Sequence, residues 1–339
     1  MDRRRIRMED LAARCGVSVA TVSRVLADRP GVRAELRDRV QAAAVMLGYA
    51  VPASIAGQTA VLVASQAAMV DVRRSQFTLH VLDGMRDRAT ALGMTLQIGT
   101  TAGARGTAQG ADAAIAGYLL LSPDDDADIA AAALLDRPVI LVNADDPMMR
   151  LSSVAPCNRT AAARATDVLL RLGHRRILFL TRPGRRTIAR RREGWADRLT
   201  TEGLHPDPAL VLEVDDWLPE VAAAAVARRL AQGPRDFTAI LAAGDSLAIG
   251  ALMALAQAGI DVPGQVSVMG FDGLPQCALQ SPPLSAVEIP MQAIGRLAID
   301  LLREAHGAPD LPARRIELAC RIIERGSTGP APATGTNRA

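Results

Sequence analysis

The chain has 339 residues, is 49% hydrophobic and carries a formal net charge of +3 at pH 7. All 39 basic residues are arginine, which excludes enzymes that depend on a phosphate-loop or Schiff-base lysine. The four cysteines are far apart, and no apolar run suits a secretory leader or a membrane span, so we expect a cytoplasmic protein with reduced cysteines, no cofactor, no metal and no membrane partner.

Residues 8–26 predict two short helices joined by a tight turn. Apolar residues recur at helical spacing in both halves, at Leu11, Ala12, Cys15, Val17, Val22, Val25 and Leu26. Gly16 can take the positive φ of a sharp reversal, and Ser18 is a good N-cap for a helix that begins at Val19. The pattern is typical of a helix-turn-helix, whose second helix enters the DNA major groove. An αα-hairpin of an unrelated core is the alternative, which the N-terminal position and the charge disfavour.

The N-terminal part carries the positive charge of the chain. Residues 1–52 hold ten arginines and six acidic residues, a charge of +4 that leaves −1 for the rest. A basic head on a near-neutral body suits contact of the head with DNA phosphates. A third helix is expected over 33–47. We therefore divide the chain into a DNA-binding domain (1–49), a linker or degenerate hinge (50–59), a two-lobed body (60–326) and a disordered tail (327–339).

From residue 60 onward, short apolar runs alternate with amphipathic segments. The runs expected to be strands are 61–63, 95–98, 116–121, 138–142, 177–180, 210–214, 239–242 and 266–270. The segments expected to be helices are 81–92, 160–172, 191–202, 220–232 and 248–258. This alternation indicates parallel sheets with helices on both faces, and its two sets indicate two lobes. The fold class is therefore α/β, an all-α head followed by a doubly wound body with a ligand cleft between its lobes.

The sequence resembles the lactose-repressor (LacI) family of bacterial transcription regulators over nearly its whole length. The matching segments are 16–26, 30–32, 47–49, 172–177, 261–268, 270–272 and 325–327. The resemblance implies a body of the periplasmic-binding-protein type and a regulator, most often a repressor, whose operator affinity depends on a small molecule between the lobes. The implied effector is a sugar, a polyol, a sugar acid or a related metabolite. The other implied partners are double-stranded, pseudo-palindromic operator DNA and a second copy of the chain, since no heptad repeat suggests a tetramer.

By this resemblance, the residues expected to contact DNA are Ser18, Val19, Ala20, Thr21, Ser23, Arg24, Tyr49 and Ile55. Val19 and Ala20 can offer only apolar contacts, for example to a thymine methyl group, so hydrogen-bonded reading of bases falls largely to Arg24. Thr21 and Ser23 would meet phosphates, with plain helix surface as the alternative. Ile55 could act as a minor-groove wedge, but the linker is shorter than the family's hinge and lacks its motif, so a simple tether is equally expected.

The same resemblance places effector binding at Phe77, Arg191, Trp217, Asp245 and Asp272. The arginine and the two aspartates would hydrogen-bond hydroxyl or carboxylate groups of the ligand. The Trp217 ring would stack on a sugar face, and Phe77 would line the first lobe. Together these residues predict a site for a small polar ligand between the lobes.

The arginine run 190–192, with two more arginines at 185–186, would favour an anionic ligand such as a sugar acid or a phosphorylated sugar. A solvated charge run at a helix start is the alternative. The chain also departs from the family pattern, since Gly244, Gly273 and Cys157 stand where the family usually has an asparagine and two aspartates. These departures predict an altered effector site.

Two other functions share the body fold. A solute-binding protein would have the two lobes but not the basic head, and we expect it to carry a leader. A doubly wound enzyme would need a Gly-x-Gly-x-x-Gly after the first strand or a serine elbow, and neither occurs. His174, which could suggest catalysis, lies in a turn before a strand and is expected to be structural.

Overall fold

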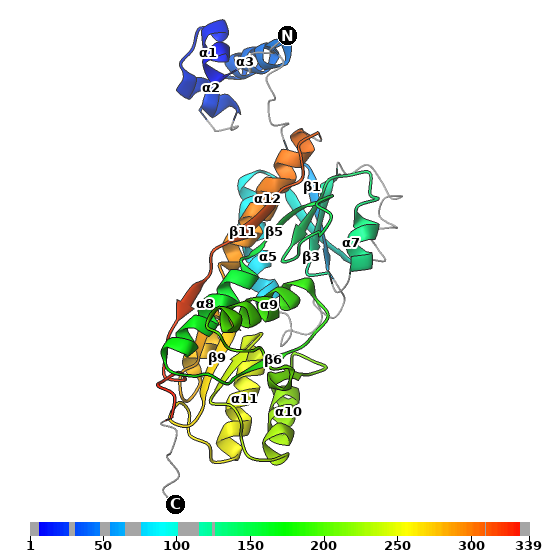
Figure 1. Ribbon diagram of the computed structural model, residues 1–339. Helices are drawn as coiled ribbons and strands as arrows, with labels where there is room; N and C mark the ends of the chain where they lie inside the picture. Colours follow the sequence, from blue (N-terminus) through cyan, green and yellow to red (C-terminus); the bar gives the residue numbers. More distant parts are fainter. Residues whose placement is uncertain are drawn as a thin grey trace, which may run out of the picture.

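The computed structural model describes residues 7–26, 31–47, 55–64, 76–100, 115–123, 126–308 and 310–332, and the following concerns these residues. They form a three-helix head and a body of two sheets with helices packed on them (Figure 1). In the part of the chain described, no helix is long and apolar enough to cross a membrane.

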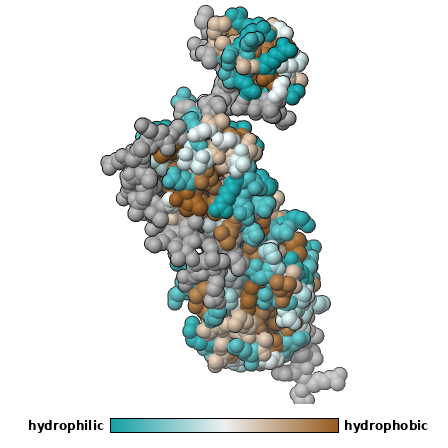
Figure 2. Space-filling view, turned by 180° about the vertical axis from the view of Figure 1, so that it is seen from behind, coloured by the Kyte–Doolittle hydropathy of each residue, from teal (hydrophilic) through white to brown (hydrophobic). Residues whose placement is uncertain are grey.

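The head consists of α1 (Met8–Cys15), α2 (Val19–Leu26) and α3 (Ala34–Leu47). It has a hydrophobic core of its own, formed by Leu11, Ala12, Cys15, Val22, Val25, Val40, Ala43 and Ala44. Gly16 ends α1 with φ 63°, a left-handed conformation that suits glycine. The Ser18 hydroxyl accepts the Thr21 backbone N–H at 3.1 Å and so caps α2. The predicted helix-turn-helix is confirmed, and hydrophilic residues dominate the rear surface of the head (Figure 2).

The first lobe is built on a parallel sheet of order β11-β5-β4-β3-β1-β2. Its strands are β1 (Thr59–Ala64), β2 (Thr95–Thr100), β3 (Ile115–Leu121), β4 (Val139–Val142), β5 (Ser152–Pro156) and β11 (Arg315–Leu318). Successive side chains of β1 point to opposite faces of the sheet. Val61 and Val63 pack with α7 (Asp126–Ala132), whereas Leu62 packs with α5 (Gln76–Ala91) and α12 (Met291–Gly307).

The second lobe is built on a sheet of order β12-β10-β9-β8-β6-β7, in which only the β10–β12 pair is antiparallel among the pairs described. Its strands are β6 (Ile177–Thr181), β7 (Val211–Glu213), β8 (Ala239–Ala242), β9 (Ser267–Asp272), β10 (Ser285–Glu288) and β12 (Arg321–Ile323). Its helices are α8 (Asn158–Arg171), α9 (Arg186–Thr201), α10 (Pro219–Ala231) and α11 (Asp245–Gln257). The helices pack in pairs, α8 with α9 and α10 with α11. Trp195 of α9 stacks on Phe179 of β6 with ring centroids 5.7 Å apart.

Three segments of the described chain connect the lobes: β5 continues into α8, β10 into α12, and β11 into β12. Consequently α12, which follows second-lobe strands in sequence, lies on the first lobe beside α5 (Figure 1). The two helices approach so closely that a Cβ at Gly84 would lie 2.1 Å from the Gln292 carbonyl oxygen. Two lobes are thus confirmed, but they are not two successive sets of elements.

The predicted linker and tail boundaries are both wrong. Ile55 is only 4% exposed and belongs to the core of the body, and the Gly57 N–H donates to the Gly93 carbonyl at 2.8 Å. At the other end, Ser327 is fully buried, and its hydroxyl donates to the Val268 carbonyl at 2.6 Å. The Ala331 N–H donates to the Leu172 carbonyl at 2.7 Å, so 327–332 is part of the body. The composition of the tail suggested disorder, but hydrogen bonds to the second lobe hold residues 327–332, and the rest of the predicted tail lies outside the described residues.

Candidate functional site

One side of α2 presents a continuous solvent-exposed face. Val22 and Val25 point into the core of the head, whereas exposed side chains occupy Val19, Ala20, Ser23 and Arg24. Because the core fixes the rotation of the helix, this face is open to solvent, as a helix that enters the major groove requires. The Thr21 hydroxyl lies 2.9 Å from the Ser18 hydroxyl, so both residues already take part in the helix cap.

The structure corrects the wedge proposed at Ile55. A residue that enters the minor groove must be free to leave the protein, but Ile55 is anchored in the core beside β1. The core of the first lobe therefore includes Ile55, eight residues after the last residue of α3. Tyr49, also predicted to contact DNA, lies outside the described residues.

At the carboxyl end of the second sheet, Arg191 is a buried cation, 3% exposed. Its Nε donates to Asn158 Oδ1 at 2.8 Å, and one terminal nitrogen donates to the Ala243 carbonyl at 2.5 Å and to Asp272 Oδ1 at 3.3 Å. The guanidinium lies over the Phe271 ring, 3.7 Å from its centroid. The structure thus brings together Arg191 and Asp272, as predicted from the sequence.

Asp272 ends β9 with φ 121°, which is rare for a residue other than glycine. Burial raises the pKa of its carboxyl to about 6, and Arg191 opposes the rise. Asp245 is fully buried at the start of α11, where its Oδ2 accepts the Leu274 N–H at 2.8 Å. Burial, together with the charge of Asp272, raises the pKa of Asp245 to about 8. Asp245 therefore positions the loop after β9 through Oδ2, and its predicted contact with ligand stays a prediction.

Trp217 and Phe77 are both half-buried. The Trp217 ring packs closely on Gly244, where a Cβ would lie 3.1 Å from the ring. The indole Nε1 is buried and lacks a hydrogen-bond partner among the described residues, so it is an available donor. Phe77 lies on α5 and packs against the core of the first lobe.

A cavity of about 410 Å³ opens between the lobes beside Asp272. The first lobe contributes polar side chains from α5 and α12, and the second contributes them from β9, β10 and β12: His80, Gln292, Arg296, Asp272, Glu288 and Arg321. Of the five residues predicted to bind effector, only Asp272 lines this cavity. The sequence analysis missed the other polar residues that line the cavity. They belong to four separate segments, α5, β10, α12 and β12, which only the chain crossovers bring together.

The arginine run predicted to attract an anion already has carboxylate partners. Asp145, 10% exposed after β4, lies 3.6 Å from Arg186 Nε, 3.4 Å from a terminal nitrogen of Arg190 and 3.2 Å from one of Arg315. Arg186 and Arg190 belong to α9 of the second lobe, so two of these pairs cross between lobes. Arg192 pairs instead with Glu213 at 3.3 Å. The anionic ligand inferred from this run is therefore not supported.

His174 has the structural role expected of it. It is fully buried, with Nδ1 2.9 Å from the Thr238 hydroxyl, and with Nε2 3.0 Å from the Ser267 hydroxyl and 3.1 Å from the Gly329 carbonyl. Burial lowers the pKa of His174, which favours the neutral ring. The histidine thus joins β9 to the C-terminal segment.

Comparison with known proteins gives matches to both parts of the chain. The model of bacterial regulatory proteins of the lacI family matches residues 7–51, and that of a periplasmic binding protein-like domain matches residues 166–328. The HTH-type transcriptional regulator reg1 of Streptomyces lividans is 32% identical over 338 residues, which cover 96% of this chain and 97% of that protein.

Solved structures share the whole architecture. The complex of the transcriptional regulator CelR with cellobiose aligns with a TM-score of 0.68 at 27% identity, over 95% of this chain and 100% of that one. The lac repressor dimer bound to operator and the anti-inducer ONPF aligns with a TM-score of 0.70 at 23% identity, over 96% and 100%. The fold of head and body is therefore that of known transcriptional regulators.

Proposed function

The chain belongs to the lacI family of bacterial regulatory proteins, and on that premise we propose that it is a repressor whose operator affinity is set by a neutral hydroxylated effector bound between the lobes. As a member it is a DNA-binding transcriptional regulator and not an enzyme. The observation that carries the proposal is the 410 Å³ cavity, because both lobes line it. A ligand that contacts both lobes favours one arrangement of them over others.

The head supports reading of DNA in the major groove. The exposed residues at the start of α2, Val19 and Ala20, suit thymine methyl groups, and Arg24 suits a guanine edge or a phosphate. Ser23 lies on the same face and suits a phosphate oxygen. We propose that two heads, held by a homodimer, bind the two halves of a pseudo-palindromic operator in the bacterial cytoplasm.

The charges of the cavity favour a neutral effector, a sugar or polyol, over a sugar acid or a phosphorylated sugar. The charged side chains at the cavity already have partners of opposite sign. Glu288 lies 3.6 Å from Arg321, Arg296 lies 3.3 Å from Asp87, and Asp272 lies 3.3 Å from Arg191. Such a mixture of donors and acceptors matches hydroxyl groups, which both donate and accept. The cellobiose complex of CelR, a relative in structure, agrees with this class of ligand.

The DNA part of the proposal is tested with Arg24→Ala. Operator fragments are selected from a random-sequence pool with the wild-type protein, and affinities are measured by mobility shift at fixed salt. Loss of a base contact of about 1–3 kcal/mol weakens binding by roughly 5- to 150-fold. Arg14→Ala, an exposed arginine on α1, is the matched control, and we expect it to stay within about twofold. Equal losses of operator affinity in the two variants would contradict the assignment of base reading to Arg24.

The effector part is tested by thermal shift against matched pairs of ligands, each a neutral sugar and its phosphorylated or acid form. A ligand that binds only the folded protein raises the melting temperature. We expect stabilisation by neutral members, lost in Asp272→Asn. Stabilisation by anionic members alone would refute the proposed class. A solute-binding role, the earlier alternative, does not account for the helix-turn-helix or for the full-length match to regulators.

A further inference from the structure

Two of the four cysteines lie side by side where the chain crosses between lobes. Cys157 stands between β5 and α8, and Cys320 between β11 and β12. The Cys157 N–H donates to the Leu318 carbonyl oxygen at 2.9 Å, and Cys320 Sγ lies 3.9 Å from the same oxygen. The parallel pairing of β5 with β11 and the shared Leu318 carbonyl thus bring the two cysteines together where the two crossovers begin.

The two thiols differ in exposure and acidity. Cys157 is half-buried, whereas Cys320 is 2% exposed. The hydrogen bond from Cys320 lowers the pKa of Cys157 to about 6, against the effect of burial. The same contact, together with burial, raises the pKa of Cys320, and the Arg191 cation opposes this rise. A half-buried, more acidic thiol beside a buried one is the arrangement of an attacking and a resolving cysteine.

We propose that Cys157 and Cys320 form a reversible disulfide when hydrogen peroxide reaches the protein, and that this bond restrains the lobe crossovers. The Cys157 thiolate attacks one peroxide oxygen, the O–O bond breaks, and Cys157 becomes a sulfenic acid. The departing hydroxide takes a proton and leaves as water. Cys320 sulfur then attacks Cys157 sulfur, the S–S bond forms, the S–O bond breaks, and the hydroxyl leaves with the Cys320 proton as a second water. Two thiols are oxidised and one peroxide is reduced; an added dithiol reverses the step.

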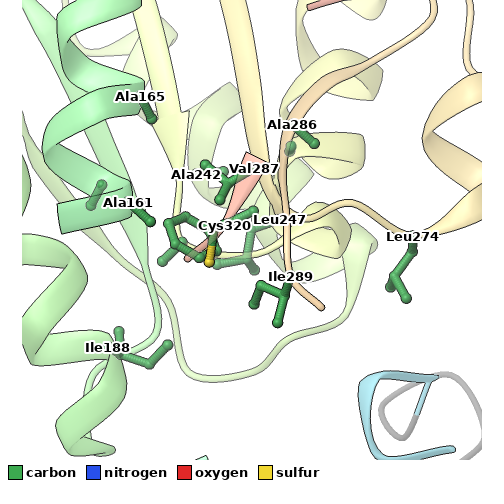
Figure 3. Close-up of a cluster of buried hydrophobic side chains, with 14 of the residues drawn as sticks. Ala161, Ala165, Ile188, Ala242, Leu247, Leu274, Ala286, Val287, Ile289 and Cys320 are labelled. Carbon is green, nitrogen blue, oxygen red and sulfur yellow. The ribbon is translucent and has the colours of Figure 1, made fainter. Parts of the chain in front are cut away.

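The bond would act on the part of the fold that joins the lobes. It ties the β5–α8 crossover to the β11–β12 crossover, which are two of the three described connections. Cys320 also lies among buried side chains from the second lobe and the third crossover, including Leu247 and Ile289 (Figure 3). Rotation of one lobe against the other must move these crossovers relative to one another, so a covalent tie opposes it. The effect on operator binding rests on the proposed function, but the crosslink itself does not.

The crosslink is tested on the full-length protein. The reduced chain is treated with hydrogen peroxide, remaining thiols are alkylated, and peptides are mapped without reduction. We expect one linked pair, Cys157 with Cys320, lighter by two hydrogens and lost on treatment with dithiothreitol, while Cys15 and Cys277 are recovered alkylated. Recovery of Cys157 and Cys320 as free thiols, as unlinked sulfinic acids or in other pairs would overturn the proposal. This readout uses the wild-type chain and does not depend on any variant folding.

The restraint is tested by hydrogen–deuterium exchange of the oxidised and reduced forms. We expect slower exchange over 156–158 and 318–321 in the oxidised form, restored by dithiothreitol. Cys157→Ser and Cys320→Ser, each treated in the same way, should show no such change. A mapped disulfide with unchanged exchange at both crossovers would overturn the restraint. Failure of the reduced protein to bind any selected DNA would count against the proposed function and leave both readouts intact.

Discussion

Replacement of Arg191 by methionine tests whether the buried cation supports the second lobe through Asp272. The change removes the hydrogen bonds to Asn158 and Asp272 and leaves the Asp272 carboxylate without its cation. Breaking a buried pair from one side costs about 3–5 kcal/mol. We expect the free energy of unfolding of Arg191→Met to fall by that amount at pH 7.5. Arg192→Met is the matched control, because Arg192 is about half exposed and pairs with Glu213 at the surface. The free energy of unfolding of this control should fall by only about 0.5 kcal/mol.

The pH dependence of this loss follows from Asp272. Because the pKa of Asp272 is raised to about 6 from 3.8, the folded state holds its proton more tightly than the unfolded chain does. The cost of burying the anion therefore builds up as the pH rises from 3.8 and is fully present above about pH 6. Arg191 offsets that cost only while Asp272 is ionised. The difference between wild type and Arg191→Met should therefore be smaller at pH 5.5 than at pH 7.5. Urea unfolding followed by tryptophan fluorescence measures it, since both tryptophans, Trp195 and Trp217, lie in the second lobe. The reasoning would be refuted if Arg191→Met and Arg192→Met lost the same free energy of unfolding, or if the loss in Arg191→Met were the same at both pH values.

Three further predictions follow from other contacts. Asp145→Asn removes two ion pairs that cross between the lobes, worth about 2 kcal/mol together. The radius of gyration measured by small-angle scattering should therefore increase in this variant, and high salt should increase it in the wild type. Unchanged scattering would contradict the role of the two pairs. Gly84→Ala forces α5 away from α12 and should lower first-lobe stability by about 2 kcal/mol in chemical unfolding, whereas Gly99→Ala, 3.6 Å from its nearest neighbour, should be nearly neutral. Since burial lowers the pKa of His174 below its ordinary 6.5, the unfolded chain takes up its proton first, and thermal stability should fall below about pH 6.5 but not in His174→Gln.

The head could be predicted from sequence because each of its determinants is local. The apolar stripes, the turn glycine Gly16 and the capping Ser18 all act within a few residues of one another. The long apolar strands of the body were equally visible, since buried parallel strands have an unbroken hydrophobic signature. By contrast, β11 and β12 are short and only partly buried, and their sequences carry little such signature. They could not be separated from loops.

The composition of the site could not be predicted to the same degree. The helix α12 was not among the helices expected from the sequence. Even where periodicity identifies a helix, it does not say which sheet the helix covers, so the contribution of Gln292 and Arg296 to the cavity was not foreseeable. A run of arginines is visible as charge, but the acids that neutralise it, such as Asp145, are distant in sequence. The Leu274 backbone N–H that donates to the Asp245 carboxylate is likewise distant from Asp245 in sequence.

If the proposed function holds, the anchored Ile55 limits how far each head can lie from its first lobe. The last residue of α3, Leu47, and the buried Ile55 are eight residues apart in sequence, a span of at most about 28 Å even if fully extended. That is less than the roughly 34 Å between half-sites one helical turn apart. In the proposed dimer, the position of each first lobe therefore decides which half-site its head can reach. An effector that changes the relation between lobes can then change operator affinity without a hinge wedge, because the short linker leaves the head too little reach to compensate.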